Sequence, residues 1–203
     1  MKKLAALFAM LAFCLCANAQ FTVIGGLTTT TGKWSESVKT ENFSQFHVGV
    51  GACCRLGPAF ALLPALVYNV KGMTFQELKD GNWNLKERTS YLEIPVQIQL
   101  HVPLLPKILD LMAIGEPFVS YAISRQYQEG GSDWTGVSDW GDAKRFRYGV
   151  GLGAGVELFS HIQVSARYIW DFAGSEFSSL GEVPKQILDG KSSGLKVSAA
   201  LIF

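Results

Sequence analysis

Three polar residues, His47, Ser120 and Asp171, are of the types that form a nucleophilic triad, in which a histidine base activates a serine and a carboxylate orients the histidine. All three fall on the polar side of predicted strands and toward the same end of the predicted sheet. No catalytic motif surrounds any of them, so chance explains their placement better. We predict no catalytic residue and no enzymatic activity. A lipid-acting enzyme is kept as an alternative function, ranked second among the alternatives.

The three histidines, His47, His101 and His161, were also considered as metal ligands. A metal site needs several ligands on one patch, whereas the predicted topology places His47 at one end and the other two at the opposite end. We therefore predict no metal site and no cofactor. Cys53 and Cys54 are neighbours, and neighbouring side chains on a strand point to opposite faces, which favours two buried thiols over a disulfide.

A row of alternating glycines, Gly149 to Gly155, could be mistaken for a phosphate-binding loop. Its period is two and no helix follows it, so that interpretation fails. The same period of two defines the stretch Tyr91 to Gln99, where Leu, Ile, Val and Ile alternate with Tyr, Glu, Pro, Gln and Gln. Such alternation predicts a strand with one apolar and one polar face.

This alternation recurs about eight times along the chain. The predicted strands cover residues 21–30, 44–56, 59–71, 91–101, 111–124, 145–158, 161–172 and 193–203. Long polar connections (31–43, 72–88, 125–144 and 173–192) alternate with short ones, which are Gly57-Pro58, a compact turn over 102–110, and Phe159-Ser160. Pro64 predicts an edge or a bulge in the third strand. Alternating long and short connections are typical of an up-and-down meander with two unlike ends.

The apolar faces carry aromatic residues near both ends and aliphatic residues between them, as the two interfaces of a bilayer select. The predicted lipid-facing aromatic girdle consists of Phe46, Tyr68, Tyr121, Tyr148, Tyr168, Trp170 and Phe203. The polar faces combine repeated glycine with charge, which suits the narrow interior of a closed eight-stranded barrel. The predicted lumenal charge network consists of Arg55, Lys71, Glu93, Glu116, Arg147, Glu157, Arg167, Asp171 and Lys196. Within it, Lys71 and Glu93 are expected to meet across one hairpin.

We therefore predict an all-β fold, an eight-stranded antiparallel up-and-down transmembrane β-barrel. The N-terminus has a basic start, an apolar run and the sequence Ala17-Asn18-Ala19, which predict a signal peptide over residues 1–19 and a barrel domain over 20–203. The expected location is the cell outer membrane. A formal net charge of +1 gives no indication of a nucleic-acid partner.

The chain resembles the PorT-like family of small outer-membrane β-barrel proteins of diderm bacteria. The resemblance lies in Tyr68-Asn69-Val70-Lys71-Gly72, Tyr91-Leu92-Glu93-Ile94-Pro95, Gly149-Val150-Gly151-Leu152-Gly153 and the terminal Leu201-Ile202-Phe203. It implies residence in the outer membrane. The family's namesake takes part in protein secretion, so the resemblance also implies a component of a secretion apparatus as the first alternative function.

The function that we expect is structural or interaction-based, without an open pore. The expected partners are outer-membrane lipid, the barrel-assembly machinery that would read the terminal Phe203, and an extracellular or membrane protein that meets the long connections. A soluble ligand-binding barrel is an alternative from another class. It needs an apolar interior, for which Leu63 and Val67 are the main support.

Overall fold

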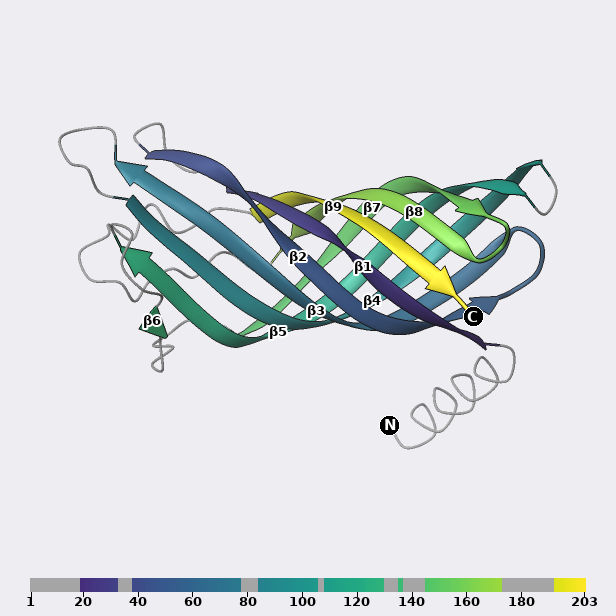
Figure 1. Cartoon of the computed structure of the whole chain (residues 1–203), viewed down its shortest axis with the longest axis horizontal. Helices are drawn as coiled ribbons and strands as arrows, with labels where there is room; N and C mark the ends of the chain where they lie inside the picture. Colours follow the sequence, from purple (N-terminus) through teal and green to yellow (C-terminus); the bar gives the residue numbers. More distant parts are fainter. Residues whose placement is uncertain are drawn as a thin grey trace.

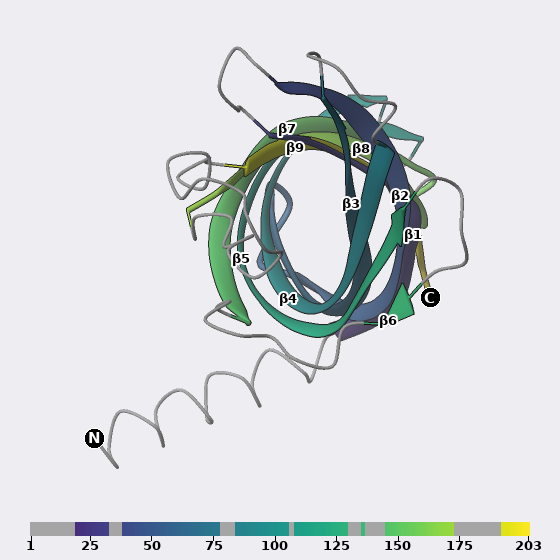
Figure 2. The ribbon, with the colours of Figure 1, turned by 90° about the vertical axis from the view of Figure 1, so that its left-hand side faces the viewer.

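The computed structural model describes residues 19–32, 38–77, 84–105, 108–129, 135–136, 145–172 and 192–203. They form one sheet of nine strands: β1 (Ala19–Gly32), β2 (Val38–Arg55), β3 (Phe60–Glu77), β4 (Asn84–Leu105), β5 (Leu109–Glu129), β6 (Thr135–Gly136), β7 (Phe146–Leu158), β8 (Ile162–Asp171) and β9 (Ser192–Ile202). The strand order is β4-β3-β2-β1-β9-β8-β7-β5, and a further pairing between β4 and β5 closes the ring. Figure 2 shows the closed ring of strands viewed along the barrel axis. The two-residue β6 pairs with β5 beside the ring.

All the pairings are antiparallel, so the fold is the predicted closed eight-stranded barrel. The start of β1 and the C-terminus lie at the same end as the short turns, on the right in Figure 1. We call this the short-turn end, and the opposite end the long-connection end. Among the residues that the structure describes, no helix is long and apolar enough to cross a membrane.

Alternation along each strand separates the inside of the barrel from the outside. Strand β8 alternates perfectly between exposed and buried residues. Tyr168 and Trp170 point outward and are exposed, whereas Arg167 and Asp171 point inward and are buried. The buried side of this barrel is therefore the polar side, the reverse of a soluble sheet packed on an apolar core.

Two tight turns at the short-turn end agree with the sequence prediction. Gly57, between β2 and β3, has a φ of 121°, which glycine adopts without a steric penalty. Phe159 and Ser160, between β7 and β8, have φ of 53° and 60°. Two consecutive left-handed residues are what a type I′ hairpin turn requires. Both Cys53 and Cys54 are buried free thiols, also as predicted.

Four strands extend well beyond the sequence prediction at the long-connection end. Residues 38–43, 72–77, 84–90 and 125–129, which were assigned largely to polar connections, belong to β2, β3, β4 and β5. At the short-turn end, most of the compact turn predicted over 102–110 is also strand, since β4 reaches Leu105 and β5 begins at Leu109. The alternation of polar and apolar residues is weak in these segments, so the sequence pattern did not predict the strands that backbone pairing extends through them.

The prediction for Pro64 was wrong. Pro64 lies in the middle of β3, which is paired on both sides, and the closed barrel leaves it no edge. The register with β2 is the same before and after it, from Gly51↔Ala65 to Cys54↔Leu62. Pro64 therefore interrupts the ladder locally without a bulge. Its ring faces outward and is exposed.

Candidate functional site: a charged cluster inside the barrel

Glycines on the inner face make room for the charged side chains. A Cβ atom on Gly153 would lie 2.0 Å from the Ala166 carbonyl oxygen and 2.8 Å from Arg167 Cγ. One on Gly26 would lie 2.0 Å from the Val197 carbonyl oxygen and 2.8 Å from the imidazole of His47. Real Cβ atoms do not approach so closely, so these glycines leave space that larger neighbours fill. The crowding that the glycine row predicted is present.

The centre of the lumen holds two acidic and two basic side chains. Lys196 Nζ, on β9, lies 2.5 Å from Glu93 Oε1 on β4 and 3.1 Å from Glu116 Oε1 on β5. Arg167 on β8 pairs with the other oxygen of Glu116 and donates to Ser198. All four charged side chains are at most 4% exposed. Burial of charge is costly unless each group is paired, and here each is.

A second group lies next to it, toward the long-connection end. Lys71 Nζ on β3 lies 3.8 Å from Glu93 Oε2 and 3.5 Å from Asp171 Oδ2 on β8. Arg147 Nε on β7 donates to the same Asp171 oxygen at 3.0 Å. The Lys71 ammonium also lies 5.2 Å from the ring centroid of Tyr91 and 5.1 Å from that of Phe118, within reach of cation–π attraction. The expected contact between Lys71 and Glu93 is thus present.

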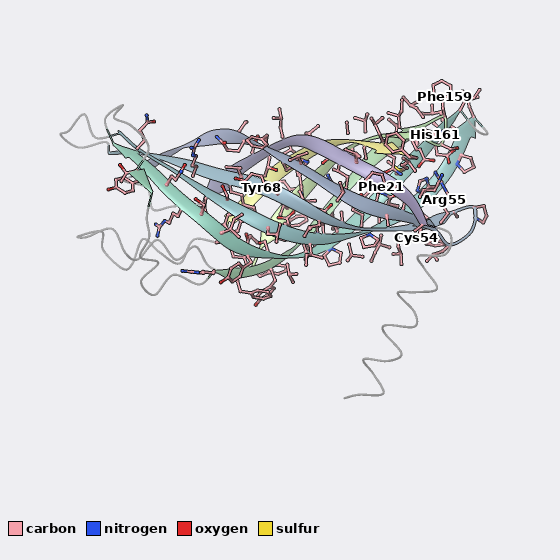
Figure 3. All side chains as sticks on the ribbon, turned by 60° about the horizontal axis from the view of Figure 1, so that its bottom comes forward. Phe21, Cys54, Arg55, Tyr68, Phe159 and His161 are labelled. Carbon is pink, nitrogen blue, oxygen red and sulfur yellow. The ribbon has the colours of Figure 1, made fainter. Side chains whose placement is uncertain are left out.

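The remaining two predicted charges, Arg55 and Glu157, lie apart from the other seven, at the short-turn end. Arg55 Nη2 on β2 is 2.8 Å from Glu157 Oε1 on β7. Glu157 also accepts from Gln163 Nε2 at 2.8 Å, and Gln163 exchanges hydrogen bonds with Gln99. Figure 3 labels Arg55 at this end, near Cys54.

Several of these ion pairs join strands on opposite sides of the ring. In the strand order, β9 lies opposite β4, β8 opposite β3, and β7 opposite β2. The pairs Lys196–Glu93, Lys71–Asp171 and Arg55–Glu157 therefore each span the lumen. An eight-stranded barrel is just narrow enough for side chains from opposite walls to meet. The seven central residues carry four positive and three negative charges, so the cluster is nearly neutral.

The three residues considered as a catalytic triad do not come together. His47 contacts the hydroxyls of Thr28 and Ser198 through its two ring nitrogens, at 3.0 and 2.8 Å. The Ser120 hydroxyl is buried without a hydrogen-bond partner, and Asp171 is paired with basic groups. His47 is 1% exposed and thus has no contact with solvent through which a substrate could reach it.

Sequence reasoning missed the neutral members of this network. Asn69 Nδ2 donates to Glu93 Oε2 at 3.1 Å, and Ser198 accepts from Arg167. Gln97, Gln99 and Gln163 form a buried chain of amide hydrogen bonds on the side of the central cluster that faces the short-turn end. All of them lie on the polar face that the alternation defined. The sequence therefore predicts that their side chains point into the barrel, but it does not predict their hydrogen-bond partners.

The outer surface is apolar, and the seven aromatic residues of the expected girdle lie on it. Phe46, Tyr121, Tyr148, Tyr168, Trp170 and Phe203 are 40–68% exposed, and Tyr68 is partly exposed. The rings of Phe46 and Tyr68 pack 6.1 Å apart, and those of Tyr168 and Trp170 4.8 Å apart. Exposed leucines, isoleucines and valines lie on the outside of every long strand. An apolar surface of this extent marks contact with a membrane rather than with water, which excludes the soluble barrel.

A closed antiparallel barrel with an apolar outside and a charged inside defines an integral outer-membrane β-barrel protein. The family model described as "Outer membrane protein beta-barrel domain" matches residues 17–175, and the chain belongs to this family. The protein is therefore a small barrel of the outer membrane. No curated protein matches the sequence at a significant level.

Solved structures of bacterial outer-membrane proteins are similar over nearly their whole length, at low identity. The attachment invasion locus protein Ail of Yersinia pestis, solved with the heparin analogue sucrose octasulfate, is 10% identical, with a TM-score of 0.46 over 92% of this chain and 99% of that one. Neisserial surface protein A is 12% identical, with a TM-score of 0.46 over 90% and 97%. OprG from Pseudomonas aeruginosa is 13% identical, with a TM-score of 0.39 over 91% and 93%.

Proposed function

We propose that this protein has a structural or interaction role, in which its long-connection end meets an extracellular or membrane protein partner and its lumen conducts nothing. The observation that supports this proposal best is the continuation of β2–β5 beyond the aromatic girdle. These four strands stay paired to one another as far as Val38↔Glu77, Gln76↔Asn84 and Leu85↔Glu129. They form an extended sheet on one side of the barrel, on the left in Figure 1.

The size of this extended sheet is that of a binding surface rather than of a turn. Strand β3 continues for nine residues beyond Tyr68, to Glu77. At about 3.3 Å per residue and a typical barrel tilt, this corresponds to roughly 20 Å along the barrel axis. A barrel that only anchors itself in the bilayer does not need strands beyond the girdle, whereas a partner-binding protein needs a rigid scaffold for its connections.

The packed lumen supports the absence of an open pore. Glu93, Glu116 and Arg167 are each about 1% exposed, and the pair that Glu93 forms with Lys196 crosses the barrel. A conducting channel of this strand number would need an empty centre, and wider barrels provide one. The neutral balance of the cluster also differs from a selectivity ring, which carries one sign of charge.

The finer assignment to PorT-like proteins is part of the same proposal and rests on the sequence resemblance given above. If this assignment is right, the first alternative function also applies, in which the protein is a component of a protein-secretion apparatus. We also propose that residues 1–19 are removed as a signal peptide, leaving a barrel domain from Gln20, and that the termini face the periplasm.

The experiment shortens the extended sheet without disturbing the barrel. Deleting residues 73–76 together with 84–87 removes four paired residues from each of β3 and β4, from Met73↔Glu87 to Gln76↔Asn84, and preserves the alternation. Cells are cross-linked, and the neighbours that copurify are compared. We expect the shortened protein to assemble but to lose the neighbours captured by the intact one. Lys71→Met, which changes only the lumen, should retain them.

One outcome would contradict the proposed partner-binding surface. If the shortened and intact proteins capture the same neighbours with the same yield, the extended sheet is not the partner-binding surface. Retention of a heat-dependent shift in electrophoretic mobility shows whether the shortened barrel has folded, so that loss of a partner is not confused with loss of the fold.

A further inference from the structure

Three potential metal ligands come together at the short-turn end of the lumen, apart from the central charged cluster. His101 on β4, Asp110 on β5 and Glu157 on β7 each present one ligand atom, and these atoms all lie within 4.8 Å of one another. His101 Nδ1 is 3.8 Å from Asp110 Oδ2 and 4.0 Å from Glu157 Oε2. The His101 side chain is only 2% exposed.

The hydrogen bonds around His101 leave one of its ring nitrogens without a partner. Gln99 uses its amide nitrogen to donate to Gln97 and Gln163, so its oxygen faces His101 Nε2 at 3.2 Å. An amide oxygen can only accept, which places the imidazole hydrogen on Nε2. The buried Nδ1 has no hydrogen-bond partner. In this tautomer its lone pair faces two carboxylates, which is unfavourable unless Nδ1 binds a proton or a metal cation.

We propose that His101, Asp110 and Glu157 bind a divalent first-row transition-metal ion of the Zn²⁺ class. One imidazole nitrogen with two carboxylate oxygens suits such ions, whereas Mg²⁺ and Ca²⁺ prefer oxygen ligands throughout. The Gln99 oxygen on Nε2 is the outer hydrogen bond that metal-binding histidines usually have. Arg55 holds the other oxygen of Glu157 at 2.8 Å and so orients this carboxylate.

The three ligand atoms, which lie within 4.8 Å of one another, must move closer together to bind one ion. Bonds of about 2.1 Å in tetrahedral geometry place ligand atoms about 3.4 Å apart. The two distances from His101 Nδ1 exceed this by about half an ångström. Asp110 has the freedom to close the gap, since its side chain is 21% exposed, and this exposure also provides access from solvent. Asp110 and Glu157 are already direct cross-strand partners. A bound ion would tie β4, β5 and β7 together, and a water molecule would complete its coordination.

This site differs from the sequence expectation of no metal. That expectation considered the three histidines as ligands for one another, whereas the structure combines one of them with carboxylates. The sequence predicts a turn at Asp110 and places Glu157 in the charged network, and it brings neither of them beside His101. The site is independent of the proposed partner binding.

The test uses the refolded chain without an affinity tag, freed of metal, in detergent. Zn²⁺ binding is measured by competition with a chromophoric chelator, and unfolding by urea is measured with and without Zn²⁺. We expect one Zn²⁺ per chain, a higher urea midpoint with Zn²⁺, and no such effect of Mg²⁺. His101→Gln and Asp110→Asn should each weaken Zn²⁺ binding by at least about tenfold.

His161→Gln is the matched control. His161 lies at the same end but is exposed, and its Nδ1 contacts the Phe159 carbonyl oxygen at 2.5 Å. The His161→Gln variant should bind Zn²⁺ as tightly as the unmodified chain does. Absence of Zn²⁺ binding, or equal binding by His101→Gln, would overturn the proposal. If His101→Gln does not fold, the partly exposed Asp110→Asn decides the question alone.

Discussion

Lys196 and Glu93 form a buried ion pair across the full width of the barrel. Lys196 Nζ on β9 lies 2.5 Å from Glu93 Oε1 on β4, although these strands lie opposite one another in the ring. The same ammonium reaches Glu116 Oε1 at 3.1 Å, so one cation joins two carboxylates. This arrangement makes Lys196 the residue on which the central cluster depends most.

Replacement of Lys196 by methionine should destabilise the barrel strongly. The substitution keeps a long apolar stem but leaves Glu93 and Glu116 without their shared partner. Breaking one side of a buried pair typically costs about 3–5 kcal/mol. The urea midpoint in detergent or lipid should fall accordingly, and adding Glu93→Gln should restore part of the loss.

The matched control for this substitution is Arg55→Met. Arg55 also pairs across the lumen, but its side chain is 33% exposed, so water screens the interaction and the loss should be much smaller. Equal losses for the two substitutions, or additive losses in the Lys196–Glu93 double variant, would show that the central pair is not coupled as the geometry requires.

Two adjacent glycines provide a second test, of crowding inside the barrel. A Cβ atom on Gly26 would lie 2.0 Å from the Val197 carbonyl oxygen, whereas one on Gly25 would have no atom within 4 Å. Gly26→Ala should cost about 1–3 kcal/mol, as overpacking does. Gly25→Ala should be neutral or slightly stabilising, since alanine restricts the unfolded chain. Similar unfolding midpoints for both variants would contradict a crowded lumen.

The turn between β7 and β8 offers a stabilising substitution. Ser160 has a φ of 60°, in the left-handed region that favours glycine. Ser160→Gly should therefore raise the free energy of unfolding by roughly 0.5–1 kcal/mol. Gly57→Ala, at a φ of 121°, should lower it. A lower unfolding midpoint for Ser160→Gly would mean that the turn is not strained.

The architecture was predictable from the sequence because alternation records which face of a strand meets lipid. Arg147, Glu157 and Asp171 were all placed on the inner face by the period of two, and all three are buried there. The contact between Lys71 and Glu93 followed from one hairpin. Their stronger partners, Asp171 and Lys196, lie on distant strands. Such contacts depend on the width and stagger of the closed barrel, which no single strand encodes.

The lengths of β2–β5 were less predictable for a different reason. Beyond the girdle the alternation of polar and apolar residues weakens while backbone pairing continues, and alternation was the signal that predicted the strands. The metal-ligand trio shows the same limit, because Asp110 lies in a segment read as a turn and meets His101 only once β4 and β5 are paired past Val102↔Leu111. Contacts that form only when the barrel closes can be identified from the structure but not from the pattern of single strands.

Labelling of intact cells tests the orientation. Tags inserted near Gly81 or Gly131, both outside the described residues, should be reachable from outside, because insertions are tolerated best in exposed connections. Tags at Gly57 or Ser160 should be hidden or should prevent assembly. The protein should fractionate with outer membranes and change its electrophoretic mobility on heating. The reverse labelling pattern would invert the topology.

Recording from planar lipid bilayers tests the proposed absence of an open pore most directly. The purified, refolded protein is added to the bilayer, with a known open porin as the positive control and detergent alone as the negative control. Because paired charges from opposite strands meet across the lumen, we expect the unmodified protein to produce no discrete conductance steps. Regular, reproducible steps from the unmodified protein would contradict a barrel whose role is interaction rather than transport.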